Sequence, residues 1–240
     1  MTITETRAMI DADPAFAALV EQLWRIRQEK AAIQERRKEI YAMLAPRFAK
    51  GDIASGHDHV LKQRVVKPRR QPPKVSAAVV KKTRTTLWER SRVPVERVAA
   101  TAPGRLTIDR AALKLPAVPD RRATLIRIET ALEKASYAEH AEREKHAKEV
   151  LQRYAVEHLG YVPLGERDNP EDCGDGWSGE PIEFADGWKV GLTAVQFSEE
   201  RMKQLDPEMW KKLAVSTMSN EVTTYYFTDR TSMDEVETAD

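Results

Sequence analysis

The chain has 240 residues, of which 41% are hydrophobic and 32% are charged, and its formal net charge is +1. This composition permits one large or two small folded domains, and the high charged fraction indicates long solvated helices or flexible arms. A single cysteine, Cys173, excludes an intramolecular disulfide and a zinc site built on several cysteines.

The sequence contains no evident targeting or membrane-spanning segment. Its N-terminal residues lack the basic stretch and apolar run of a secretory signal. No apolar stretch approaches the ~20 residues that are needed to cross a bilayer. We therefore expect a soluble, cytoplasmic protein without membrane contacts. Its expected fold is α+β and helix-rich, with two long helices and small β-ribbons.

The first predicted element is a long helix from about Pro14 to about Arg47. Asp13 is a favourable N-cap, and Pro14 suits the first helical position. Apolar side chains recur at alternating steps of three and four, which predicts a heptad stripe. The stripe consists of Phe16, Leu19, Leu23, Ile26, Ile33, Ile40 and Leu44. Lys30 and Arg37 fill the two remaining seam positions.

This stripe packs either inside the chain or against a helix of another protein. Packing inside the chain is the simpler alternative. The two seam charges favour a partner helix, because they need water or acidic partners and can specify the register of a coiled coil. The predicted partner-binding residues are Leu23, Ile26, Lys30, Ile33 and Arg37.

A basic segment follows at residues 62–92, with eleven Lys or Arg and one acid, a net charge of +10. Residues 59–66 alternate loosely and predict an exposed strand, and a short helix is expected around 76–88. The prolines at 68, 72 and 73 favour an extended arm between them. Its predicted binding residues are Arg64, Lys67, Arg69, Arg70 and Lys74.

Two partners fit this arm equally well. One is nucleic acid, whose phosphates would give salt-sensitive, sequence-independent affinity. The other is an acidic protein surface, including the acidic segment of this chain. Trp88 is the only aromatic residue of the basic segment, so the sequence does not indicate a platform for base stacking.

The middle of the chain contains a second predicted long helix. Residues 93–119 are rich in proline and alanine and include one strand candidate at 105–109. The helix is expected from about Asp120, a suitable cap, to about Leu159, because Gly160 favours a helix end.

The last third of the chain mixes acidic, strand and helix signals. Residues 166–186 contain eight acids and one arginine. Residues 182–197 predict two strands joined at Asp186–Gly187, which is a favourable hairpin turn. A helix at about 198–213 and a strand at 222–228 complete the predicted elements.

The two halves of the chain repeat at an offset of 122 residues, as Trp88 and Trp210 show. The other identities include Ser76 with Ser198, Lys81 with Lys203, Val93 with Val215 and Thr101 with Thr223. A tandem duplication or chance could produce this pattern. In a duplication both tryptophans are expected to be core anchors. The predicted units are 1–119 and 120–228, followed by an acidic, disordered tail at 229–240.

Few motifs indicate chemistry. His57 and His59 could bind a metal from one strand, but no second pair lies nearby in sequence. The acidic segment matches three positions of an EF-hand loop but places Cys173 and Ile182 where ligands belong. Fingerprints of hydrolases, P-loops and dinucleotide sites are absent. We predict no catalytic residue, metal or cofactor, and leave open a nuclease built on scattered acids near 166–189.

In three segments the layout resembles early-region proteins of actinobacterial phages. These are the charged helix PAFAALVEQLWRIRQEKAAIQERRKEIYAML, the basic stretch HVLKQRVVKPRRQPPKV and the tryptophan-centred helix VVKKTRTTLWERSRVPV. The chain looks most like the recombination directionality factors of large serine integrases. It is more loosely similar to phage accessory proteins of DNA metabolism with an N-terminal helical hairpin.

The resemblance implies a non-enzymatic regulator with no small-molecule substrate. Directionality factors bind the integrase on attachment-site DNA and reposition its coiled-coil subdomain, so that integration gives way to prophage excision. The alternative implied function is an accessory protein that binds single-stranded DNA, or a metal-dependent nuclease.

Overall fold

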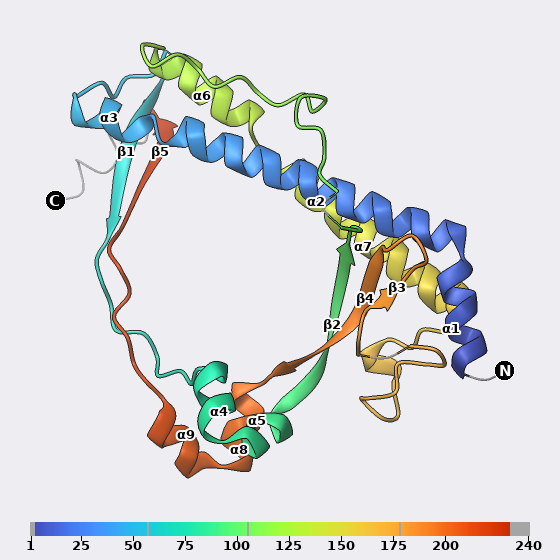
Figure 1. Ribbon diagram of the computed structural model, residues 1–240. Coiled ribbons are helices and arrows are strands. Elements are labelled where there is room, and N and C mark those ends of the chain that lie inside the picture. The colour runs from blue at the N-terminus through green and yellow to red at the C-terminus, as the bar shows by residue number, and fades with distance from the viewer. Residues whose placement is uncertain (1–2, 57, 105, 178, 231–240) are drawn as a thin grey trace. The chain divides into compact units, whose positions relative to one another are not determined.

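The computed structural model describes residues 3–56, 58–104, 106–177 and 179–230. The fold is α+β and helix-rich, which confirms the predicted class (Figure 1). Two compact units are present. The first consists of Met1–Ile26, Arg70–Ile108 and Glu142–Thr217, and the second of Arg27–Arg69, Asp109–Ala141 and Met218–Asp240. These units do not follow the predicted boundary at residue 119, because strands from the two sequence repeats pair with each other. The predicted tail lies outside the described residues from 231 onward.

The core of the first unit lies between two long helices and a small sheet. Helix α1 spans Ile3–Ala12, α2 spans Pro14–Tyr41 and α7 spans Ala138–Leu159. The predicted cap is confirmed, since the backbone N–H of Phe16 donates to Asp13 Oδ1 at 2.8 Å. Apolar side chains of α2 and α7 and of the adjacent sheet form one buried cluster. Its members include Phe16, Val20, Leu23, Trp24, Leu151, Ala155, Leu159, Trp188 and Val190.

The sheet of the first unit has the order β2-β4-β3 and is antiparallel. Its strands are β2 (Arg92–Thr101), β3 (Ile182–Glu183) and β4 (Lys189–Phe197). The predicted turn is confirmed by Gly187, whose φ of +87° suits glycine. The strand predicted at 105–109 is wrong, since residues 106–109 form no strand. Strand β2 lies at the sheet edge, which tolerates its Pro94.

A helical module in the first unit confirms that the two repeats fold alike. It contains α4 (Ala77–Thr83), α5 (Thr85–Arg90), α8 (Glu199–Leu205) and α9 (Pro207–Leu213). Lys81 lies 4.7 Å from the ring centre of Trp88, and Lys203 lies 4.7 Å from that of Trp210. The residues between the paired helices, Arg84 and Asp206, have φ values of −148° and −149°.

The strand pairing around this module also relates the two repeats to each other. Val93 pairs with Gln196, and Lys74 forms a bridge with Val215. A shift of 122 residues converts the first pair into the second. The module core consists of the buried Val75, Val80 and Met202, against which both tryptophans pack. The predicted role of Trp88 and Trp210 as core anchors is confirmed.

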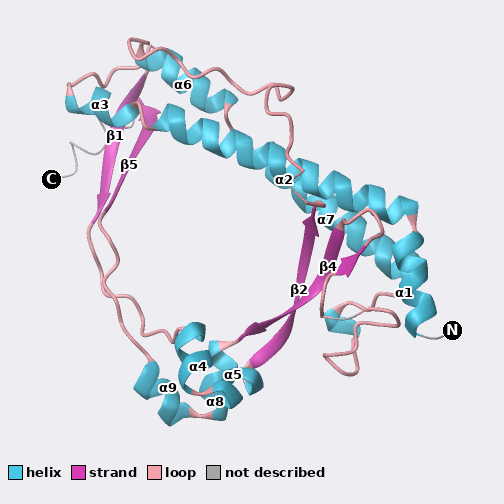
Figure 2. Cartoon of the chain, viewed as in Figure 1, coloured by secondary structure: helices cyan, strands magenta, loops and turns pink. Residues whose placement is uncertain are grey.

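The second unit contains α3 (Leu44–Ala49), α6 (Leu125–Lys134) and a ribbon of β1 (His59–Val66) with β5 (Val222–Asp229). Figure 2 shows the two strands side by side. Its core joins side chains from α2, α3, β1, α6 and the residues flanking α6, namely Ile40, Leu44, Leu61, Ala123, Leu125, Ile128, Ala131, Leu132 and Ala135.

The predicted helix from Asp120 to Leu159 is wrong as a single element. It is divided into α6 and α7 at residues 135–137. The first helical hydrogen bond of α7 runs from the backbone N–H of Ala141 to the carbonyl of Tyr137 at 2.9 Å, and Ser136 Oγ accepts the N–H of Ala138 at 3.5 Å before it. Asp120 instead accepts the N–H of Arg122 in a turn before α6. Gly160 ends α7 with a φ of +66°, as predicted.

The acidic segment folds onto the core of the first unit. It begins with a short 3-10 helix, Leu164–Glu166. Cys173 and Trp177 are buried in that core, and the indole N–H of Trp177 donates to the carbonyl of Leu159 at 2.8 Å. Glu171 and Asp172 remain exposed. The segment is therefore a folded loop with solvated acids.

Candidate nucleic-acid interface

The predicted strand HVLKQRVV is β1, and its partner comes from the end of the described chain. The register pairs Lys62 with Tyr226, Arg64 with Thr224, and Val66 with Val222. Successive side chains of a strand point to opposite faces. Leu61, Tyr225 and Phe227 belong to the face that packs against the helical core. The Lys62, Arg64 and Val66 side chains therefore lie on the other face, which we call the outer face of the ribbon.

The start of the basic segment, residues 62–66, is a paired strand and not a free arm. Beyond β1, the backbone of Arg69 exchanges hydrogen bonds with Ser219, since the Ser219 N–H donates to the Arg69 carbonyl at 2.9 Å and the Arg69 N–H donates to Ser219 Oγ at 3.0 Å. The predicted residues Arg64, Lys67 and Arg69 are all exposed within the second unit. The pairing holds their backbone and leaves their cationic side chains in solvent.

Arg70 and Lys74, the other two predicted binding residues, belong to the first unit. Both are exposed. Arg70 Nε donates to Ser216 Oγ at 3.1 Å, and Lys74 is bridged to Val215 through the backbone. The structure thus places three of the five predicted cations in the second unit and the other two in the first.

Tyr226 is the functional candidate that sequence reasoning missed. It lies directly across from Lys62, and 44% of it is exposed. A base can stack on such a ring while a neighbouring cation contacts the phosphate. The basic segment alone contains no tyrosine, so only the pairing of distant strands reveals this combination. The available signal was the predicted strand at 222–228, because the two faces of a strand separate Tyr226 from the core residues Tyr225 and Phe227.

Exposed apolar side chains extend the outer face toward the end of the ribbon. Val66 and Val222 form a cross-strand pair and are 39% and 50% exposed. Met218, which precedes β5, is 61% exposed. Contiguous exposed apolar side chains beside cations are typical of a surface that another macromolecule covers.

A buried carboxylate anchors the base of the ribbon to α6. Glu129 is 4% exposed; the hydroxyl of Ser55 donates to Oε2, and His59 Nδ1 lies 2.6 Å from Oε1. His59 Nε2 also lies 3.0 Å from Asp229 Oδ1. The hydrogen bond to Glu129 raises the pKa of His59 above 6.5. Because Ser55 bonds to the carboxylate and not to the imidazole, this arrangement does not activate a serine nucleophile.

The apolar stripe of α2 contributes mainly to the protein's own interior. Leu23 belongs to the core of the first unit, and Ile26 and Ile33 are 6% and 8% exposed. The alternative of packing inside the chain is therefore confirmed for these three residues. Arg37 Nη1 donates to the carbonyl of Leu132 at 2.6 Å, near the C-terminus of α6, where cations are favoured. Lys30 is half-buried.

The metal motifs receive no support from the described positions. His57 lies outside the described residues, and His59 is engaged by two carboxylates. Cys173 and Ile182, which fell on ligand positions of the EF-hand match, are buried in the core of the first unit. Among residues 3–56, 58–104, 106–177 and 179–230, no three His, Cys, Asp or Glu side chains are grouped to hold a metal ion.

No helix in the described ranges combines the length and apolarity that crossing a membrane requires. Comparison of the chain with protein-family models, with curated proteins and with solved structures finds no match.

Proposed function

We propose that this chain is a non-enzymatic phage regulator of site-specific DNA recombination. In this proposal it acts in the cytoplasm of the host cell, binds a large serine integrase on attachment-site DNA and shifts it from integration to excision. The observation that carries the proposal is the outer face of the β1–β5 ribbon, where the exposed Arg64 and Tyr226 lie together with the half-buried Lys62.

The ribbon suits a contact with DNA held by a second protein. Its cations can contact phosphates without reading sequence, so they would position the protein while the integrase supplies specificity. The exposed Val66–Val222 pair adds an apolar area that a protein partner can cover. The predicted contact with the integrase coiled coil is not assigned to the stripe of α2, because Leu23, Ile26 and Ile33 are buried.

The energetics that such a regulator needs are modest. It acts as an allosteric ligand with different affinities for two integrase–DNA arrangements. A hundredfold preference corresponds to about 2.7 kcal/mol. A few phosphate contacts and one apolar pair can supply a free energy of this order, since hydrogen bonds to charged groups contribute roughly 1.5–3 kcal/mol each.

A second candidate function is an accessory protein that binds single-stranded DNA. The cross-strand pair of Lys62 and Tyr226 favours it, because an aromatic ring beside a cation is the usual element of such sites. The two candidates differ in what they bind alone. A single-strand binder holds DNA tightly without the integrase, whereas the regulator holds it tightly only in the integrase complex.

An excision reaction with the serine integrase of the same phage tests the proposal. We expect the protein to switch on recombination between left and right attachment sites and to supershift the integrase–DNA complex. The Lys62→Ala/Arg64→Ala variant should lose most of this activity, while Lys38→Ala, which removes an exposed cation on α2, should retain it. Removal of two contacts with duplex phosphates should also reduce the magnitude of the slope of log K for DNA binding against log salt concentration by about 1.8.

Three outcomes contradict the proposal. If the rate of excision does not change when the protein is added, the protein is not a regulator of this reaction. Tight binding to DNA alone with a steep salt dependence favours the single-strand binder. Magnesium-dependent cleavage of any DNA substrate shows that the protein is a nuclease.

A further inference from the structure

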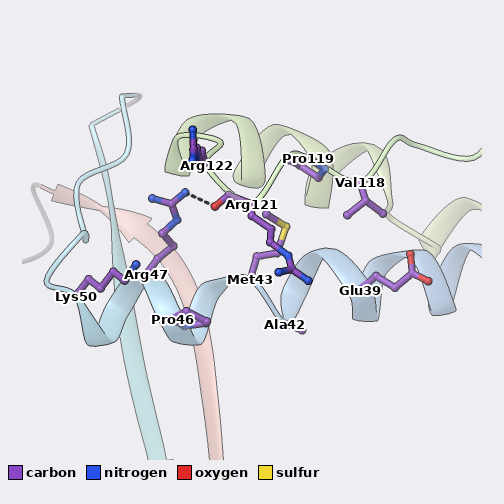
Figure 3. A pocket seen from close by; sticks show the side chains of 10 residues that line it. All are labelled: Glu39, Ala42, Met43, Pro46, Arg47, Lys50, Val118, Pro119, Arg121 and Arg122. Atoms are coloured by element: carbon purple, nitrogen blue, oxygen red, sulfur yellow. Dashed lines mark hydrogen bonds between the residues drawn. The ribbon is translucent and has the colours of Figure 1, made fainter.

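A cavity of about 740 Å³ lies in the second unit, between the end of α2, helix α3 and the segment before α6. Figure 3 shows the side chains that line it. Four of them are cations, Arg47, Lys50, Arg121 and Arg122, and only Glu39 is a carboxylate. The ribbon does not contribute to this cavity, so its charge is a separate feature of the unit.

Arg47 fixes the geometry of the cavity wall. Its guanidinium donates to the carbonyls of Arg121 and Ala123 at 2.9 and 2.6 Å, and to Asp52 Oδ2 at 3.2 Å. These bonds hold the turn before α6 against α3. The guanidinium is therefore largely satisfied inside the protein, and its main effect is to position the backbone that carries Arg121 and Arg122.

The other three cations are available to a ligand. Lys50, Arg121 and Arg122 are exposed, and within the described part of the chain none of their side chains has an ion-pair or hydrogen-bond partner. In Figure 3 the Arg121 side chain extends toward Met43 and Ala42, across the space that the cavity occupies. Four cations gathered with a single carboxylate around one cavity favour an anion between them.

Part of the cavity lining is apolar. Met43, Pro46, Val118 and Pro119 line it beside the cations. A purely ionic ligand such as sulfate would leave these side chains uncovered. A ligand with an anionic group and a flat, poorly hydrated body would contact both parts, and a nucleoside phosphate has this combination.

We propose that this cavity binds a nucleoside phosphate. Lys50 and Arg121 contact the phosphate, and the base lies against Met43 and Val118. The ligand is either a free nucleotide or one nucleotide of a DNA strand, and the second form rests on the proposed function. Glu39, on the same wall, opposes the phosphate and limits the affinity.

Calorimetry with two probes tests this at low salt, using dAMP and 5′-phosphorylated hexathymidylate. Removal of one exposed cation should weaken binding roughly threefold to fivefold, so Lys50→Ala/Arg121→Ala should weaken it about tenfold or more. Glu39→Gln should strengthen binding about twofold, an effect that damage to the fold would not produce. Lys38→Ala is the matched control, because it removes an exposed cation of the same unit outside the cavity.

The two probes separate the sources of the ligand. Binding of dAMP that depends on Lys50 and Arg121 supports a free nucleotide, whereas binding of the hexamer alone supports a DNA strand. If neither probe binds, or if the double variant binds like the wild type, the inference is wrong. If the hexamer binds weakly, and its binding is lost in Lys62→Ala/Arg64→Ala but kept in Lys50→Ala/Arg121→Ala, the inference is overturned and the proposed function is left intact.

Discussion

Val80 and Met202 occupy equivalent positions of the two repeats, and exchanging them tests whether the repeats share one core. Both side chains are fully buried and belong to the same small cluster. We consider Val80→Met, Met202→Val and the double variant that carries both changes. The double variant keeps the total side-chain volume of the cluster, whereas each single variant changes it.

The magnitudes follow from the burial of both sites. Met202→Val removes about one methylene and should destabilise the module by about 1 kcal/mol. Val80→Met inserts the same volume into a filled core and should cost roughly 1–3 kcal/mol. A volume-conserving exchange usually costs less than about 1.5 kcal/mol. We therefore expect the double variant to be more stable than the sum of the single effects by at least about 0.5 kcal/mol.

Hydrogen exchange of peptides that cover 76–91 and 198–213 measures this locally, because a small module can open without global unfolding. A tenfold change in protection corresponds to 1.4 kcal/mol. Val79→Met is the matched control, since the neighbouring Val79 is 43% exposed and should tolerate the larger side chain. Additive effects of the two single changes would refute the shared core.

Two further predictions concern polar contacts. The raised pKa of His59, caused by its bond to Glu129, means that its stabilising charge is present below pH 6.5 and is lost as pH rises through the elevated pKa. The stability difference between wild type and His59→Gln in urea unfolding should therefore shrink from pH 6 to pH 8, and a difference that grows with pH contradicts this. Trp210→Phe removes a hydrogen bond of 2.8 Å to Glu199 and should lower thermal stability by about 1–2 kcal/mol, more than Trp88→Phe does. Equal losses at the two tryptophans would count against the bond.

Local sequence signals predicted much of the fold. The Asp13 cap, the strand His59–Val66, the Gly187 turn and the equivalence of the two tryptophan helices were all readable, because each depends on neighbouring residues. The break between α6 and α7 was missed, since residues 135–137 contain neither glycine nor proline. The break is visible only in the structure, where residues 135–137 are not helical.

The candidate site was less predictable than the fold. The cations of β1 stood out in the sequence, but Tyr226 gained meaning only through its pairing with Lys62. Strand register between distant segments depends on tertiary packing, which no local pattern contains. The cavity beside α3 also depends on tertiary packing and could not be predicted from the sequence. Lys50 and Arg121 come from distant segments that Arg47 holds together.

The pairing of His59–Val66 with Val222–Asp229 also constrains how the protein is made. During synthesis β1 leaves the ribosome long before its partner exists, so a basic, partly apolar strand waits with both edges unpaired. Contacts between such distant segments slow folding and prolong exposure to aggregation. The charges of Lys62 and Arg64 reduce that hazard, since charged side chains on a strand oppose edge-to-edge association. The same cations that we assign to partner binding thus also protect the nascent chain until its last strand arrives.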